Sequence, residues 1–373
     1  MIEIRRIDSA AGFALLEREW NDLLRRSAAD TIFLTHQWLA AWWDAFGTSD
    51  SLCVLLCIEN DGHESRLVGI LPGYIQRDRC LRSVRRLRFL GSEVVTSDFL
   101  DLITAPGRET EVLDAILDHL SRSGSVHILD LTDIREGSPL LQQGEGGANS
   151  DGWVFHRWPV YKRCPVIALP ADWNAYLASQ SRRFRRNFQY YQRHLQAQGM
   201  ELQVLRTPEQ IAEALGDFQV LHNSRRGQMN QGGIFATPQQ QQFYADVLQR
   251  LARSGWVELI FLTVGGQRVA AACQFDYGKA VYYYQNGYDI SWEKESVGFV
   301  LNVLLIERAI AKGKVSYEFL RGEQEYKLRF GAHHLRILQD LYGTRGVVGA
   351  LYRDGRRVVA GCRKMAKKIL RKE

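Results

Sequence analysis

The chain has 373 residues, of which 46% are hydrophobic and 24% are charged, a composition typical of a globular protein with about two domains. Its apolar runs are too short for a membrane span, and the N-terminal residues lack a signal-peptide core. We therefore expect a cytoplasmic protein. The six cysteines show no C-x-x-C spacing and the nine histidines no H-E-x-x-H pattern, so we expect no metal site.

The net charge of +6 is concentrated at the C-terminal end of the sequence. Residues 345–373 contain ten basic and two acidic residues and so carry +8, which leaves −2 for the rest of the chain. A body so close to neutrality argues against a nucleic-acid-binding protein. The tail is predicted to be a basic helix, which is either solvated or in contact with an anionic membrane or a membrane-bound synthase.

The first 48 residues are predicted to be helical. Apolar side chains recur at helical spacing from Phe13 to Leu24, and Thr35 suits a helix cap before Trp38. Strand-like segments follow, with one amphipathic helix among them and a Gly-, Asn- and Ser-rich loop at 142–152. The predicted strands are 52–58, 67–75, 84–90, 99–103, 126–131, 153–161 and 165–169, and the helix is 109–120.

A second half is predicted to begin at Asp172, with one helix that runs to Gln198 and ends at Gly199. One side of this helix is an apolar stripe typical of a core. Arginines occupy another side, which is either a solvated face or a cradle for a phosphate-bearing substrate or tRNA. Helices are then predicted at 208–224 and 238–253, and strands at 202–205, 256–264, 268–276 and 280–288.

The most informative segment is 280–331, where a strand, a polar turn, a helix and a second strand follow one another. The helix is predicted to start at Ser296 and to end before Gly313, and the second strand closes on Arg321 and Gly322. Such a helix start can hold an anion, because its first N–H groups are unpaired and its dipole is positive there. The alternative is an ordinary βαβ unit that binds no ligand. A last strand is predicted near 335–341.

Both halves show the same order of elements, with helices first, then a meander of strands, then a helix and a strand. We therefore expect a mixed α/β fold built from two copies of one fold. The predicted organisation is a first half at residues 1–170, a second half at 171–344 and the basic C-terminal helix at 345–373.

Seven segments of the chain recur in one known superfamily. They are SRRFRRNFQYYQRHL, LHNSRRGQ, YYYQNGYD, SVGF and YEFLRGEQEYKLRFG in the second half, and FLTHQWLAAWWDAF and FLGSEVVTSDFLDL in the first. Together they resemble the GNAT superfamily of acyltransferases. The chain looks most like the branch of cellulose-biosynthesis-associated acetyltransferases, which are related to the Fem peptidoglycan aminoacyltransferases. The resemblance implies tandem GNAT-like domains, each a mixed sheet flanked by helices, with the acyl donor in the second.

In that superfamily a Q/R-x-x-G-x-G/A run before the helix wraps the coenzyme A pyrophosphate. The matching segment here has one glycine instead of two, which leaves an aminoacyl-tRNA as a competing donor. The resemblance thus implies acetyl-CoA or another acyl-CoA as co-substrate, with no metal. The implied cofactor-binding residues are Lys294, Ser296, Val297, Gly298 and Phe299.

The resemblance also implies catalytic roles for a basic–aromatic pair. The chain shows no Ser-His-Asp set, so direct transfer without an acyl-enzyme is favoured. Lys327 is expected to stabilise negative charge at the reacting carbonyl, as the lysine of the Fem pattern does, and Tyr326 to protonate the departing thiolate. Their alternatives are a surface lysine and a packed tyrosine. The candidate general bases are Asp289, Glu318 and Glu323.

Further residues are expected to bind the substrate. Arg321 is either an anion clamp or the partner of Glu318 or Glu323 in a salt bridge, and Arg225 and Arg226 are expected to contact the acceptor. The aromatic strand supplies another candidate. The remaining predicted substrate-binding residues are Tyr284 and, as walls of the acceptor site, Trp38 and Asp98.

The sequence therefore predicts an N- or O-acyltransferase that moves an acyl group from acyl-CoA to a small polar or sugar-linked acceptor of envelope or exopolysaccharide assembly. One alternative is a Fem-like enzyme that takes aminoacyl-tRNA. The other is a non-catalytic accessory protein whose basic tail docks on a polysaccharide synthase.

Overall fold

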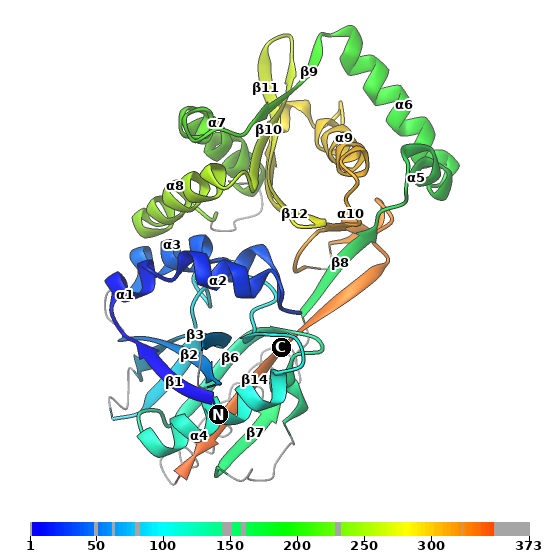
Figure 1. Cartoon of the computed structure of the whole chain (residues 1–373). Coiled ribbons are helices and arrows are strands. Elements are labelled where there is room, and N and C mark those ends of the chain that lie inside the picture. Colours follow the sequence, from blue (N-terminus) through cyan, green and yellow to red (C-terminus); the bar gives the residue numbers. More distant parts are fainter. Residues whose placement is uncertain are drawn as a thin grey trace, which may run out of the picture.

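The structure is a computed structural model in which one mixed sheet continues through the whole molecule (Figure 1). In the part that is described, this sheet has 14 strands. Its main path has the order β1-β2-β3-β4-β6-β14-β8-β13-β12-β11-β10-β9, with β5 and β7 off the path. The described residues are 2–47, 51–61, 64–78, 83–143, 151–157, 162–227, 233–322 and 324–346.

The first half opens with a strand and not with a helix. Ile2–Ile7 forms β1, which pairs antiparallel with β2. Its partly buried and exposed side chains alternate every two residues, a strand pattern that the prediction of a helical segment over residues 1–48 overlooked. The predicted strand at 99–103 is also wrong, because Phe99 has a left-handed φ of 62° and only Ile103–Thr104 is extended. The other elements are α1 Ala10–Ala14, α2 Glu17–Leu24, α3 His36–Phe46, β2 Ser51–Asn60, β3 Ser65–Arg77, β4 Arg85–Phe89, β5 Ile103–Thr104, α4 Glu109–Ser123, β6 Ile128–Arg135 and β7 Trp153–Arg157.

The second half starts with two helices where one was predicted. Gln180 and Ser181 are extended, and the Ser181 hydroxyl accepts a hydrogen bond from the N–H of Phe184, so a new helix starts there. The elements of this half are β8 Lys162–Ala168, α5 Trp173–Ser179, α6 Arg182–Ala197, β9 Met200–Leu205, α7 Pro208–Gly227, α8 Pro238–Arg253, β10 Val257–Val264, β11 Gln267–Tyr277, β12 Ala280–Tyr288, α9 Val297–Ala311, β13 Ser316–Glu318, α10 Glu325–Leu328 and β14 His334–Arg345.

The two halves repeat one order of elements. In the first, β1 leads through the helices α1–α3 to the meander β2-β3-β4, then to α4 and to β6, which is parallel to β4. In the second, β9 leads through α7 and α8 to the meander β10-β11-β12, then to α9 and to β13, which is parallel to β12. The predicted class, a mixed α/β fold in two copies with helices on both sides of the sheet, is confirmed.

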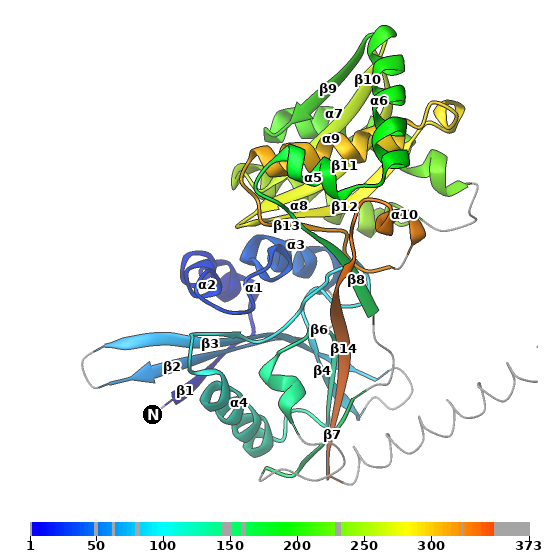
Figure 2. The same ribbon diagram turned by 90° about the vertical axis from the view of Figure 1, so that its right-hand side faces the viewer.

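The halves are joined by the sheet itself. The twelve-residue strand β14 pairs with β8 at one end and with β6 and β7 at the other, and Figure 2 shows it running from the second half down into the first. A boundary near residue 170 stays a prediction, since backbone hydrogen bonds cross it without a break.

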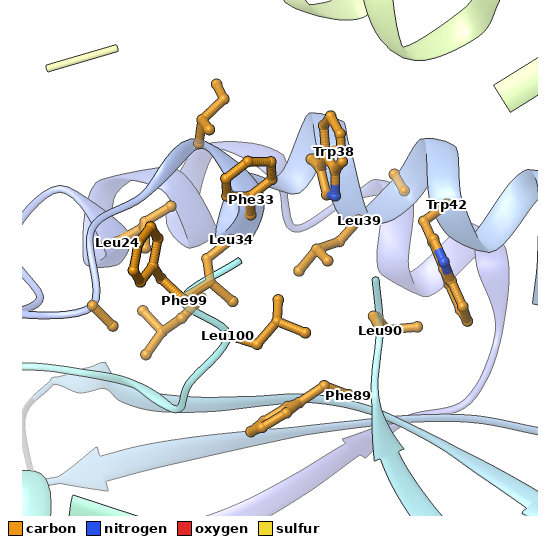
Figure 3. Close-up of a cluster of buried hydrophobic side chains, with 14 of the residues drawn as sticks. Leu24, Phe33, Leu34, Trp38, Leu39, Trp42, Phe89, Leu90, Phe99 and Leu100 are labelled. Atoms are coloured by element: carbon orange, nitrogen blue, oxygen red, sulfur yellow. The ribbon is translucent and has the colours of Figure 1, made fainter. Parts of the chain in front are cut away.

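An apolar layer between α1–α3 and the first-half sheet extends into the second half. Figure 3 shows Trp38, Leu39 and Trp42 of α3 above Phe89 of β4 and Leu100 of the segment between β4 and β5. The same layer reaches α8 and β12 through fully buried aromatic rings, each of which contributes about 2–3 kcal/mol by burial. In the described part of the chain, no helix is both long and apolar enough to cross a membrane.

Candidate active site

The candidate site lies where two parallel strands separate. Strands β12 and β13 pair over only three residues, ending at Tyr282 opposite Glu318. Beyond that point β12 continues to Tyr288 along β11, and a register shift at Tyr284 leaves one extra residue that bends it. The chain after β13 turns away from β12. The sheet therefore opens into a wedge, at a position where open α/β sheets commonly bind ligands.

Two local features hold the wedge open. Leu320 adopts a left-handed φ of 57° directly after β13, and the buried Lys327 ammonium donates to the carbonyl oxygens of Phe319, Leu320 and Arg321 at 2.9, 3.2 and 3.0 Å. On the other strand, Gly287 allows close contact with α7, because a Cβ there would lie 2.4 Å from the backbone of that helix. Each strand is thus fixed away from the other.

The wedge contains a cavity of about 250 Å³, which we call the first cavity. Its walls are the end of β12, the first turn of α9 and the aromatic residues Tyr326 and Phe330. Ser296 precedes α9 with a left-handed φ of 53° and gives no side-chain cap, a conformation that costs about 1–2 kcal/mol outside glycine and is concentrated at ligand sites. The N–H groups of Val297 and Gly298 lie in the first turn of α9, where a helix offers them no carbonyl acceptor. That turn has no acidic side chain.

A second cavity of about 480 Å³ adjoins the first and shares Ser296, Phe299 and Arg329 with it. Its opposite wall is the start of α6, with Ser181 and Arg183. Two helix N-termini therefore meet across this cavity. Neither has an acidic residue in its first turn, whereas the α6 start is rich in arginine.

The two helix starts and the two arginines make the second cavity positive, and Glu293 on the wall of the first cavity offsets only part of that charge. Arginines at a helix start add to the positive end of the dipole instead of compensating it. Arg183 and Arg329 are exposed, and the described part of the chain gives neither an ion pair. An anion between the two helix starts would receive N–H groups, dipoles and guanidinium groups together.

The structure brings five predicted residues together. Ser296, Val297, Gly298 and Phe299 line the first cavity with Tyr326. Val297 is fully buried, backbone included, whereas Phe299 packs edge-on against Phe184 at 5.2 Å between ring centroids. The helix start that was predicted to accept an anion is therefore open to a cavity and adjacent to Tyr326.

Three other predicted residues do not line either cavity. Lys294 is exposed on the turn before α9. The Asp289 carboxylate accepts hydrogen bonds from the N–H and hydroxyl of Ser291, so it caps a short turn. Lys327 is only 4% exposed, and burial lowers its pKa to about 8. Its contacts are those of a positioning residue for the turn after β13, and its predicted role at the reacting carbonyl stays a prediction.

Arg321 has partners that the sequence did not indicate. Its guanidinium is paired with Asp98 and donates to the Ser97 carbonyl at 2.9 Å and to Asp133 at 3.1 Å. Burial opposes the charge on Arg321, but the two carboxylates overcome this effect and raise its pKa; burial also raises the pKa of Asp98. Arg321 thus forms an ion pair between the halves, and Glu318 is paired with Arg336 instead.

The expected acceptor walls are parts of the core. Trp38 is fully buried, donates from its indole N–H to the Ser97 hydroxyl at 2.9 Å and packs edge-on against Tyr284 at 5.5 Å between centroids. Tyr284 shares a hydrogen bond of 2.9 Å with Tyr244. Together with the ion-paired Asp98, these residues lie at the junction of the halves and not at the first or second cavity.

Some predictions fall at the limit of the described residues. Arg225 and Arg226 lie in the last turn of α7, but their side chains are outside the described part. Glu323 and residues 347–373 of the basic tail are also outside it. Among the candidate bases, the described Glu318 is fully buried, burial raises its pKa, and its Oε2 has no hydrogen-bond partner.

Sequence reasoning missed three polar residues of the second cavity, namely Arg183, Asn187 and Arg329. A usable signal was present. Serine is a preferred N-cap residue, and a helix start at Ser181 would have placed the arginines at an N-terminus rather than on the side of a longer helix.

No group of three or more His, Cys, Asp or Glu side chains that could hold a metal ion occurs within the described ranges. The expectation of a metal-free reaction stays a prediction. The polar groups of the candidate site are backbone N–H groups, arginines, Tyr326 and Glu293.

Comparisons with known proteins concern the fold and one of its domains. Residues 182–328 match the family model of the acetyltransferase (GNAT) domain, and no curated protein sequence matches the chain. A crystal structure of FemX superposes with a TM-score of 0.63 and 11% identity, covering 94% of this chain and 99% of that one.

Two further structures are similar over nearly their full length. A conserved protein of unknown function from Bacteroides thetaiotaomicron gives a TM-score of 0.53 at 11% identity and covers 93% of this chain and 100% of its own. The C-terminal domain assigned to a lysylphosphatidylglycerol synthetase of Agrobacterium fabrum gives 0.50 at 11%, covering 94% and 97%. Such identities show a shared fold alone. Residues 182–328 are thus similar to the GNAT acetyltransferase domain, within an overall fold similar to that of FemX.

Proposed function

We propose that the protein is an acyltransferase whose acyl-CoA donor enters the wedge between β12 and β13. The main support for this proposal is the position of the first cavity. It borders the start of α9, which has no side-chain cap, and adjoins the second cavity, which is lined by Arg183 and Arg329. A thioester donor needs both parts, a narrow channel for its neutral arm and a positive region for its phosphates.

The residues fit such a donor in order along the two cavities. The partly exposed first-turn N–H group of Gly298 suits a pyrophosphate. Arg329, which lines both cavities, and Arg183 suit the remaining phosphate charge. The single glycine is no obstacle to this arrangement, because Phe299 beside it turns its ring to Phe184 and the cavity stays open.

The reaction we propose is direct transfer to an amine or hydroxyl. The acceptor attacks the thioester carbonyl, the carbon–sulfur bond breaks, and the acyl group remains on the acceptor while its proton is lost to a base. Tyr326 lines the first cavity and is the group we assign to protonate the leaving thiolate. We propose a small polar or sugar-linked acceptor of envelope or exopolysaccharide assembly, in line with the resemblance to the cellulose-biosynthesis branch, and a cytoplasmic reaction.

Calorimetry with acetyl-CoA and with free CoA tests the donor site. We expect saturable binding of both, weakened as salt concentration rises because phosphate contacts are screened. Release of free thiol in the presence of a panel of amines and sugars then tests transfer. Absence of any heat or thermal stabilisation with acetyl-CoA, palmitoyl-CoA and CoA would sink the proposal.

A second candidate is an aminoacyltransferase that takes aminoacyl-tRNA. The specific observation in its favour is the exposed arginine cluster at the start of α6, in which Arg182, Arg183 and Arg186 are accessible beside the second cavity. Electrophoretic mobility shifts with charged tRNA separate the two candidates. Salt-sensitive binding of tRNA without binding of CoA favours this second one, and CoA binding without tRNA binding removes it.

A further inference from the structure

A buried ion pair joins the first half to the turn that follows β13. Asp98 belongs to the segment between β4 and β5 in the first half, and Arg321 lies in the turn after β13 in the second. The Asp98 side chain has no exposed surface and accepts from two groups of Arg321, the backbone N–H at 2.8 Å and the guanidinium. One carboxylate therefore fixes both the main chain and the side chain of this arginine.

The turn after β13 is held by the sheet only at its two ends. These ends, Phe319 and Gly322, donate backbone hydrogen bonds of 2.9 and 3.1 Å to carbonyl groups of β8. Arg321 lies between them, and its N–H donates to the Asp98 carboxylate instead. The middle of the turn therefore takes its position from a side chain of the other half.

Tyr326 is connected to this turn in two ways. It is next to Lys327 in α10, a helix of four residues without a side-chain cap, which depends on contacts outside itself. The Lys327 ammonium donates to three carbonyl groups of the turn. The Tyr326 ring also packs edge-on against Phe319 of the turn, at 6.5 Å between ring centroids. A displaced turn therefore displaces the ring that lines the first cavity.

Strained backbone is concentrated around this ion pair. Five residues other than glycine have a left-handed φ in the described part of the chain. Three of them are in this network, because Phe99 follows Asp98, Leu320 precedes Arg321, and Asp133 accepts from the Arg321 guanidinium at 3.1 Å. Such conformations are costly and are found mostly where a site must be held in one geometry. A buried ion pair likewise adds little stability over apolar residues of similar size.

We infer that Asp98 is a positioning residue for the proposed acyl transfer. It fixes Arg321 and the carbonyl groups that bind Lys327, and in this way it sets the placement of Tyr326 at the first cavity. The inference rests on the proposed function, in which Tyr326 protonates the leaving thiolate. The first half thus contributes to the reaction through the turn after β13, although Asp98 lines neither the first nor the second cavity.

Two matched substitutions in the full chain test this role. Asp101 is also fully buried and paired with an arginine, but its partner, Arg135 at 2.7 Å, belongs to the first half. We expect Asp98→Asn and Asp101→Asn both to lower the melting temperature. Only Asp98→Asn should lower kcat for thiol release, by about 10- to 100-fold, with the dissociation constant of acetyl-CoA within about twofold of wild type. An equal kcat in the two variants overturns the inference.

Fluorine NMR measures the placement of Tyr326 without any reaction. With 3-fluorotyrosine at position 326 alone, the resonance should shift or broaden in Asp98→Asn and stay as in wild type in Asp101→Asn. An unchanged resonance in Asp98→Asn overturns the inference. A wild type that binds no CoA contradicts the proposed function alone, because the resonance reports the position of the ring with or without a donor.

A double variant separates positioning from stability. Asp98→Asn with Arg321→Met removes both charges together, keeps an amide oxygen for the backbone N–H at 321, and leaves Asp133 paired with Lys162 at 2.7 Å. Its melting temperature should exceed that of Asp98→Asn, because no buried charge loses its partner. We expect kcat to stay low and the Tyr326 resonance to stay displaced. Wild-type kcat in the double variant would show that the pair only stabilises the fold. If Asp98→Asn does not fold, the double variant is used for both measurements.

Discussion

The two halves build the same pair of parallel strands but use the space beside it differently. In the first half, β6 continues past its pairing with β4, and the chain at Leu100 fills the adjacent position by bridging to Ile134. The Leu100 N–H donates to the Asp133 carbonyl at 2.9 Å. In the second half β13 ends after three residues, and the equivalent space is the first cavity.

The helix starts differ in the same sense. The first turn of α4 carries Glu109 and Glu111, which compensate its dipole and repel anions, whereas the first turn of α9 has no acidic residue. In the first half, the space beside the parallel strands is filled and acidic residues compensate the helix dipole. In the second half, the same space is a cavity and the first turn of α9 carries no acidic residue. The proposed donor site therefore differs from its counterpart in the first half by the length of one strand and by the charges of one helix turn.

The largest effect is expected at the turn that shortens β13. Burial lowers the pKa of Lys327 to about 8 in the folded protein, from 10.5 for an ordinary lysine. Between these pH values the unfolded chain binds a proton that the folded chain has lost, so rising pH favours folding. From pH 7.5 to 10 the free energy of unfolding of the wild type should rise by about 2.4 kcal/mol relative to Lys327→Met. Denaturant titrations measure this difference; equal pH dependence in both proteins contradicts it.

Next in size is the contact that holds β12 away from β13. Gly287→Ala places a Cβ 2.4 Å from the α7 backbone and should lower the free energy of unfolding by about 2–3 kcal/mol. Gly298→Ala is the matched control, because its Cβ would meet the Tyr288 ring at an ordinary 3.4 Å. Urea unfolding compares the two. Similar losses in both variants would show that the packing of β12 on α7 does not set the wedge.

A third substitution gives α9 the acidic start of α4. Gly298→Glu adds a carboxylate where the donor phosphates are proposed to lie, so the dissociation constant of acetyl-CoA should increase about tenfold or more. Stability should hold, since the new charge compensates the dipole. Glu109→Gln on α4 is the control and should bind as wild type does. Calorimetry that finds no weakening in Gly298→Glu moves the donor away from this helix.

The smallest effect is expected at the exposed arginine that both cavities share. Arg329→Ala should weaken acetyl-CoA binding about three- to fivefold at low salt and less at high salt. Arg186→Ala is the control, because this exposed arginine of α6 lines neither cavity. An equal loss in both variants would indicate general attraction by the α6 charges and not a phosphate contact.

Local patterns predicted much of the fold and part of the site. The helix expected from Ser296 to Lys312 is α9 at Val297–Ala311, and β12 has the predicted bounds. Here apolar spacing and a terminal glycine act within a few residues. The partner of Arg321 could not be predicted, because Asp98 lies 223 residues away along the chain. The burial of Lys327 was equally inaccessible, since the carbonyls that hold it converge only at a left-handed turn.

The insertion of β14 between β6 and β8 also has a consequence for the order of folding. Because β6 gains this neighbour only when residues 334–345 have left the ribosome, the N-terminal sheet is incomplete during most of synthesis. Its exposed edge must be protected for that interval, and nascent chains truncated before His334 should bind chaperones more strongly than the full chain.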